Sequence, residues 1–208
     1  MNATDLRRGA VAERIREERL IVVLRRIEPQ SALLELVDEL ADAGASIFEV
    51  TFDAPSAADD LIAVRDRMAG GGLVGAGTVL TVESLTAAIA AGADFGVSPL
   101  HNFALVEAAV EAGLPFVPGA FTPTEMRSAW SAGATFVKLF PASAVGPQFV
   151  RELRGPLPEI ELIATGGVDK GSAAAYLAAG AVAVGIGGVL VRASRKERRA
   201  LLKSLRPK

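Results

Sequence analysis

Residues 73–98, LVGAGTVLTVESLTAAIAAGADFGVS, contain the unit from which the fold is built. Residues 73–77 form a short apolar run, typical of a buried strand. Residues 82–91 place apolar side chains three and four positions apart, which is typical of an amphipathic helix. The Ala91-Gly92 pair predicts the end of that helix, because glycine readily adopts a left-handed conformation after the last turn. A second apolar run at residues 94–98 completes a predicted strand, helix and strand.

The same unit recurs along the chain. Strands are expected at residues 20–24, 46–51, 73–77, 94–98, 115–118, 135–140, 161–165 and 182–186. Helices are expected at residues 31–43, 57–69, 82–91, 102–112, 123–132, 147–154, 171–179 and 195–205. This alternation requires parallel strands with right-handed crossovers, and eight units favour closure into a (β/α)8 TIM barrel over a doubly wound sheet. We expect one domain, residues 1–208, with an additional N-terminal helix at residues 5–19 covering the bottom of the barrel.

Composition excludes several classes of function. The chain is half hydrophobic, has a formal net charge of −2 and contains no cysteine, which excludes disulfide scaffolds, thiolate metal sites and cysteine nucleophiles. The charge gives no overall attraction to nucleic acid or to a membrane surface. The basic residues gathered after residue 191 are interpreted as the solvated face of a terminal helix. No signal-like or membrane-spanning run occurs, so a cytoplasmic location is expected.

Lys138 is the most informative residue. It is the first of only five lysines, and it lies inside the apolar run Thr135-Phe136-Val137-Lys138-Leu139-Phe140-Pro141. Burial of an ammonium group is unfavourable unless the amine loses its proton, and a neutral amine is a nucleophile. This placement predicts carbonyl chemistry through a Schiff base. The alternative is a lysine that reaches the surface.

Glu49 is a carboxylate inside the second predicted strand and shares a face with Ile47 and Thr51. The second and sixth strands of an eight-stranded barrel lie opposite each other, so Glu49 and Lys138 are expected to converge on a central pocket. There Glu49 can transfer the protons that imine chemistry requires. The alternative is a buried ion pair without catalysis.

Other strand ends predict a site for an anionic substrate. Arg25 ends the first strand and Thr78 the third, although a rim ion pair and a helix cap are the alternatives for them. Glycines end the seventh and eighth strands, where barrels often hold phosphate, unless they only relieve crowding. These glycines are Gly166, Gly167, Gly187 and Gly188. The lone His101 is expected to be a cap or a rim residue, and no metal or other cofactor is expected.

Together these residues resemble the 2-keto-3-deoxy-6-phosphogluconate (KDPG) aldolases, with the related 4-hydroxy-2-oxoglutarate (KHG) and phosphogalactonate aldolases. The resemblance covers residues 20–192. It is carried by Val23-Leu24-Arg25, Phe48-Glu49-Val50-Thr51, Val74-Gly75-Ala76-Gly77-Thr78-Val79, Val97-Ser98-Pro99, Val117-Pro118-Gly119, Val137-Lys138-Leu139-Phe140-Pro141, Val145-Gly146-Pro147-Gln148 and Thr165-Gly166-Gly167-Val168.

The resemblance implies a role for each matched residue. Lys138 would form the Schiff base and Glu49 would move protons with a water, whereas Arg25 and Thr78 would hold the keto acid. Pro99 and Phe140 would form the pocket wall, and Gly166 and Gly167 would contact a distal phosphate. It further implies a metal-free homotrimer. The chain departs from many members at two positions, with Asp53 in place of an arginine and Gly188 in place of a serine.

The sequence therefore predicts a class I aldolase, a carbon–carbon lyase. It would cleave a 2-keto-3-deoxy-6-phospho sugar acid into pyruvate and glyceraldehyde 3-phosphate, with 4-hydroxy-2-oxoglutarate as a further expected substrate. Its expected partners are these small molecules and copies of itself. The alternatives are a phosphosugar isomerase or epimerase with Glu49 as base, and a non-catalytic self-assembling barrel.

Overall fold

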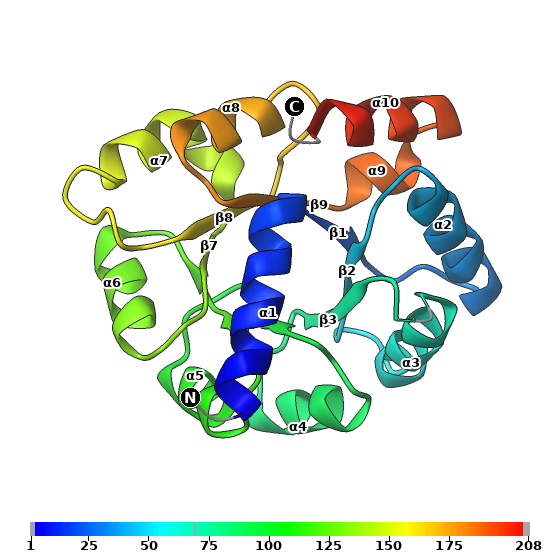
Figure 1. Cartoon of the computed structure of the whole chain (residues 1–208), viewed down its shortest axis with the longest axis horizontal. Helices are drawn as coiled ribbons and strands as arrows, with labels where there is room; N and C mark the ends of the chain where they lie inside the picture. The colour runs from blue at the N-terminus through cyan, green and yellow to red at the C-terminus, as the bar shows by residue number, and fades with distance from the viewer. Residues whose placement is uncertain (1–2, 69, 206–208) are drawn as a thin grey trace.

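The computed structural model describes residues 3–68 and 70–205, and within them nine short parallel strands form one sheet that curves into a barrel (Figure 1). The strands are β1 Leu20–Leu24, β2 Ile47–Thr51, β3 Leu73–Gly77, β4 Gly96–Val97, β5 Phe116–Val117, β6 Gly119–Ala120, β7 Val137–Leu139, β8 Leu162–Thr165 and β9 Ala183–Ile186. Their order is β5-β4-β3-β2-β1-β9-β8-β7-β6. The predicted (β/α)8 barrel is confirmed.

The fifth predicted strand, residues 115–118, is two short strands in the structure, β5 and β6. Pro118 lies between them and has no N–H to donate to a ladder. This segment nevertheless closes the barrel, because its carbonyl groups are shared between both neighbours. Val117 O accepts from Ser98 N at 3.1 Å on one side, and Pro118 O accepts from Lys138 N at 2.9 Å on the other.

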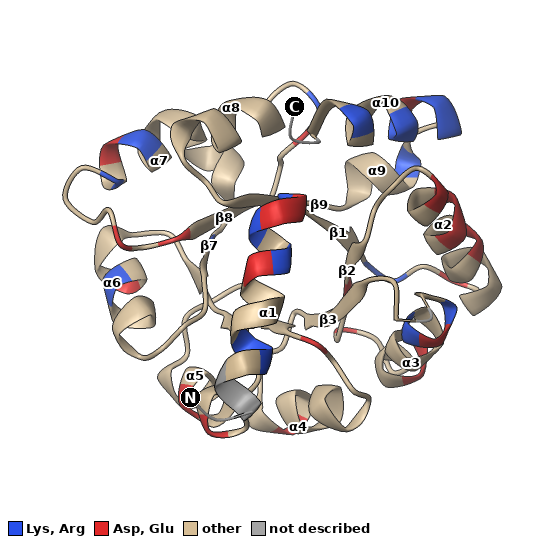
Figure 2. Ribbon diagram, in the orientation of Figure 1, with Lys and Arg blue, Asp and Glu red and all other residues tan. Residues whose placement is uncertain are grey.

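Helices surround the barrel in the expected places. They are α2 Gln30–Asp42, α3 Ala57–Met68, α4 Val82–Ala90, α5 Phe103–Glu111, α6 Pro123–Ser131, α7 Gly146–Leu153 and α8 Ala173–Ala179, with a short 3-10 turn at Ala142–Ala144. The predicted glycine stops are confirmed by the positive φ angles of Gly44, Gly92, Gly113, Gly133 and Gly180. Figure 2 shows the charged residues mainly on the helices and loops of this outer ring.

The buried residues form two clusters, one between strands and helices and one inside the barrel. The inner cluster contains Ile21, Ile47, Phe95, Val97, Val117, Phe136, Ile163 and Ala183. Ile47 precedes Glu49 by two residues, and Phe136 precedes Lys138 by two. Since side chains alternate along a strand, Glu49 and Lys138 also face the barrel interior.

The N-terminal helix α1, Ala3–Glu18, closes one end of the barrel, as predicted (Figure 1). Val11, Ala12 and Ile15 pack onto the inner cluster, and Ile15 is fully buried. Arg16 donates from Nε and Nη2 to the two carboxylate oxygens of Glu161, at 2.8 and 2.6 Å. Because α1 covers this end, a functional site is expected at the opposite end, where the strands have their carboxyl ends.

After β9 the chain forms a short helix that the sequence analysis did not predict, α9 Gly188–Arg192, and then the predicted α10 Arg195–Leu205. The interpretation of the terminal basic residues as one solvated face is wrong for Arg198, which has only 13% of its side chain exposed. Arg192 is exposed, but it belongs to α9 rather than to the terminal helix, and it lines a cavity. No helix among the described residues is long and apolar enough to span a membrane.

Candidate active site

Lys138 lies on β7 and is 3% exposed. Its Nζ lies 5.1 Å from the centroid of the Phe140 ring, and Phe136 lies beneath it in the inner cluster. Burial lowers the pKa of Lys138 from its ordinary value. The negative charge of Glu49 opposes this shift, and the positive charge of Arg25 adds to it. Burial thus shifts the amine toward its neutral, nucleophilic form.

Glu49 lies on β2, across the barrel from β7, and is 2% exposed. Its carboxylate lies against the backbone of Gly77, where any Cβ would overlap Oε1. Gly77 therefore allows the carboxylate to occupy this position. Among the described residues, Glu49 Oε1 has no hydrogen-bond partner, and no ion pair joins Glu49 to Lys138. A buried carboxylate oxygen without a partner is costly, which argues against a purely structural role.

Arg25 and Thr78 meet at the upper rim. Arg25 donates from Nη2 to Thr78 Oγ1 at 3.3 Å. Thr78 has a φ of 54°, in the left-handed region that threonine rarely adopts, and such strain is typical of functional positions. Thr78 does not cap the following helix, since Thr81 does so.

Asp53 lies beside the two arginines that follow β1. Its Oδ2 lies 3.5 Å from Arg25 Nη1 and 3.2 Å from Arg26 Nε, and 15% of its side chain is exposed. The ion pairs place its charge against the two arginines. Asp53 thereby compensates the charge of Arg25. The sequence analysis gave a rim ion pair as the alternative for Arg25 but did not name this partner.

A cavity of about 250 Å³ opens above Lys138 and brings most of the predicted site together. Its lining includes seven predicted residues, Arg25, Lys138, Phe140, Gly166, Gly167, Gly187 and Gly188. The Phe140 ring lies against Gly166, whose φ of 90° and missing side chain both suit this contact. The structure adds lining residues that were not predicted, Val23, Thr165, Val168, Gly185, Val189 and Arg192.

Three predicted residues, Glu49, Thr78 and Pro99, are outside that lining. Pro99 lies against Gly119, which pairs with Lys138 in the β6–β7 register, so it borders the same region. His101 lies on the rim, where its Nε2 is 3.0 Å from Ser128 Oγ. Asn102, rather than His101, caps α5.

Thr165 and Arg192 line the cavity but were not predicted from the sequence, and they differ in whether the sequence carried a signal for them. Thr165 follows Ile163 by two residues on β8, so strand alternation alone points it into the barrel. Arg192 gave no such signal, because the helix that carries it was not expected.

A closed barrel with a buried amine and an opposing carboxylate at its strand ends defines a barrel enzyme with a strand-end site. The family model described as KDPG and KHG aldolase matches residues 11–203, and the chain belongs to this family. The predicted family and the predicted class, a carbon–carbon lyase acting on small molecules, are confirmed.

Curated relatives and solved structures agree with the family. The chain is 36% identical over 181 residues to the 2-dehydro-3-deoxy-6-phosphogalactonate aldolase of Escherichia coli K12, covering 86% of this chain and 88% of the relative. It is 34% identical to the 2-dehydro-3-deoxy-phosphogluconate aldolase of Haemophilus influenzae, covering 81% and 79%. A KDPG aldolase of Legionella pneumophila, solved with pyruvate captured as a covalent carbinolamine intermediate, superposes with a TM-score of 0.81 at 28% identity, covering 95% of each chain.

Proposed function

We propose that this chain is a class I aldolase that cleaves a 2-keto-3-deoxy-6-phospho sugar acid to pyruvate and glyceraldehyde 3-phosphate. The observation that carries the proposal is the buried amine of Lys138, whose lowered pKa favours the nucleophilic form. The carbinolamine named for the Legionella relative supports the same chemistry. The stereochemistry, gluconate or galactonate type, is left to a substrate panel, and 4-hydroxy-2-oxoglutarate belongs in that panel.

In the proposed reaction, Lys138 Nζ attacks the C2 carbonyl of the substrate, and the resulting carbinolamine takes up a proton and loses water, which forms an iminium. This proton is released again when the last iminium is hydrolysed. Glu49 takes the proton of the C4 hydroxyl as the C3–C4 bond breaks. The bonding electrons move into the iminium and form an enamine, and the aldehyde departs. Glu49 then returns a proton to C3, and water hydrolyses the resulting iminium to release pyruvate and restore the amine.

The surroundings suit these steps. Arg25 and Thr78 offer a guanidinium and a hydroxyl to the substrate carboxylate, and Phe140 and Pro99 shield the imine from water. In this proposal Gly166, Gly167, Gly187 and Gly188 leave room for the far end of the substrate.

Borohydride trapping tests the mechanism. Incubation with pyruvate and borohydride is expected to add a stable mass to the peptide that contains Lys138, and Lys138→Met is expected to lose the label and the cleavage activity. Lys203→Met serves as a matched control, since Lys203 is exposed on α10 and does not line the cavity above Lys138. A wild-type protein without label, or a Lys138→Met protein that keeps it, would contradict the proposal. Turnover without label would favour the isomerase.

We also propose that the chain assembles as a homotrimer. Large apolar side chains are exposed on the loops after β3, β4 and β6 and on the first residues of α4 and α5, namely Leu80, Val82, Leu100, Phe103 and Phe121. Several exposed apolar residues at one end of a fold are typical of protein interfaces. A related chain was used in a cage designed by fusing symmetric oligomeric domains, with 33% identity, a TM-score of 0.81 and coverage of 90% of this chain and 70% of that one. Light scattering that gives a monomer mass would contradict this proposal.

A further inference from the structure

Arg192 is a cation at the mouth of the active-site cavity. It ends α9 and lines the same cavity as Lys138. Its guanidinium lies over Gly188, since a Cβ at residue 188 would lie 3.1 Å from Arg192 Nη1 and 3.3 Å from Nη2. A side chain at 188 would require the guanidinium to shift by a few tenths of an ångström. The glycine therefore allows Arg192 to occupy its place at the cavity.

The two arginines of the cavity differ in charge compensation. Arg25 is paired with Asp53, whereas Arg192 makes no ion pair or side-chain hydrogen bond with any of the residues that the structure describes. The charge of Arg25 also contributes to the lowered pKa of Lys138. An unpaired guanidinium presents a planar fork that suits an anion.

A second cavity also borders Arg192, and further basic residues line it. It has a volume of about 790 Å³, shares Val189 and Arg192 with the first cavity, and is also lined by Lys170 and Lys196. Its one acid among the described lining residues is Glu197, whose Oε2 accepts hydrogen bonds from Ser194 N at 2.8 Å and Ser194 Oγ at 2.7 Å. The positive charges outnumber this acid around Arg192.

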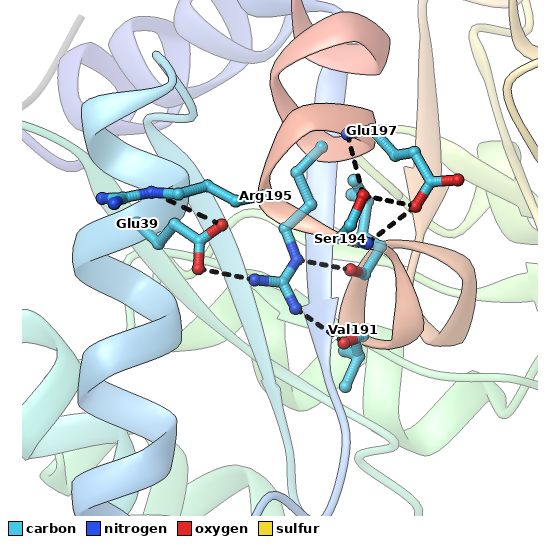
Figure 3. A network of polar contacts seen from close by, with 7 residues as sticks. Glu39, Val191, Ser194, Arg195 and Glu197 are labelled. Atoms are coloured by element: carbon cyan, nitrogen blue, oxygen red, sulfur yellow. Dashed lines mark hydrogen bonds and ion pairs between the residues drawn. The ribbon is translucent and has the colours of Figure 1, made fainter.

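A network between α2, α9 and α10 fixes the helix that carries Arg192 (Figure 3). Arg198 donates from Nε to Leu190 O and from Nη2 to Val191 O, both at 2.8 Å, and these carbonyls belong to α9. Its Nη1 is paired with Glu39 Oε2 on α2 at 2.7 Å. The position of α9 is thereby set before any ligand arrives, which reduces the ordering cost of binding.

We propose that Arg192 is a substrate-specificity residue that binds a phosphate monoester dianion at the end of the substrate that does not react with Lys138. The orientation of the substrate rests on the proposed function, because it assumes that the keto acid lies at Lys138 and Arg25. A dianion matches an uncompensated guanidinium in a positive field better than an uncharged hydroxyl does.

Equilibrium binding of glycerol 3-phosphate, an unreactive phosphate monoester, tests this inference, with glycerol as the uncharged reference. Arg192→Gln is expected to raise the dissociation constant of glycerol 3-phosphate about 10- to 100-fold, as for the loss of a charge-assisted hydrogen-bonding partner. Arg192→Lys is expected to be intermediate, because it keeps the charge and loses the fork. Arg199→Gln is the matched control, since Arg199 is exposed on α10 and outside both cavities. It is expected to bind as the wild type does.

Three results would overturn the inference: wild-type protein that does not prefer glycerol 3-phosphate to glycerol, Arg192→Gln protein that binds as tightly as the wild type, or an equal loss in Arg199→Gln. The binding measurement needs no imine, so its outcome is independent of the borohydride label. A label without an Arg192 effect rejects this inference alone. An Arg192 effect without a label rejects the proposed aldolase mechanism and leaves the anion site standing.

Discussion

The lower and upper halves of the barrel interior come from the same strands and have opposite chemistry. Below, Ile47 and Phe136 pack with the residues of α1 and are almost completely buried. Two residues further along the same strands, Glu49 and Lys138 are equally buried but ionisable. One half of the interior thus excludes water with apolar side chains, whereas the other holds ionisable groups, which in the proposed mechanism gain and lose protons.

The largest expected effect concerns the carboxylate of the upper half. Glu49→Gln is expected to lower the rate of substrate cleavage about 10²- to 10⁴-fold, since proton transfer loses its acid–base group. The pyruvate label on Lys138 should persist, because the amine remains. Steady-state cleavage and borohydride trapping measure the two separately. Cleavage at the wild-type rate would remove Glu49 from the mechanism.

Glu49→Gln also tests how the charge of Glu49 affects the pKa of Lys138. The charge of Glu49 raises the pKa of Lys138, so its removal should lower that pKa further. The neutral amine would then persist to lower pH. The pH profile of labelling is expected to shift to lower pH.

The next prediction compares how substitutions in the lower and upper halves of the barrel interior change the free energy of unfolding. Phe136→Ala in the lower half is expected to reduce the free energy of unfolding by about 3–5 kcal/mol, through a cavity in the inner cluster. Lys138→Met in the upper half should increase it, because an apolar chain replaces a buried amine. Urea denaturation measures both. Ile62→Ala, on the exposed side of α3, is a control expected to change it by about 0.5 kcal/mol or less.

The stabilisation by Lys138→Met has a defined pH dependence. The folded-state pKa of Lys138 lies below its unfolded value, so the unfolded chain binds more protons between the two. Wild-type stability therefore rises with pH across this window, and the advantage of the variant shrinks there. A Lys138→Met protein less stable than the wild type at low pH would show that the amine has a structural role.

The smallest expected effect is that of Arg25, at the rim of the barrel, on the pKa of Lys138. Arg25 contributes to the lowered pKa of Lys138, so Arg25→Met should raise that pKa and shift the labelling profile to higher pH. Arg127→Met removes an exposed arginine paired with Glu159 and is the matched control. Overlapping profiles for the wild type and Arg25→Met would place the Arg25 charge too far away to act.

Much of the contrast between the lower and upper halves of the barrel interior was predictable from local sequence patterns. The apolar runs and glycine stops give eight units, and the alternation along a strand places Lys138 in phase with Phe136 and Glu49 in phase with Ile47. The interruption at Pro118 was less accessible, because a break in strand pairing depends on which neighbours the segment has on both sides. The α9 helix was missed because a five-residue helix carries too little periodicity to recognise.

The sequence by itself determined the barrel, its apolar lower layer and the two ionisable residues above it, because strand and helix periods are local properties of the chain. Only the tertiary structure decided that Asp53 compensates Arg25, that Gly77 makes room for Glu49, and that Arg192 reaches the cavity from the region that the sequence assigned to a solvated basic face. These contacts join residues from different units. Closure of the barrel sets their distances, and the strand and helix periods do not encode these distances.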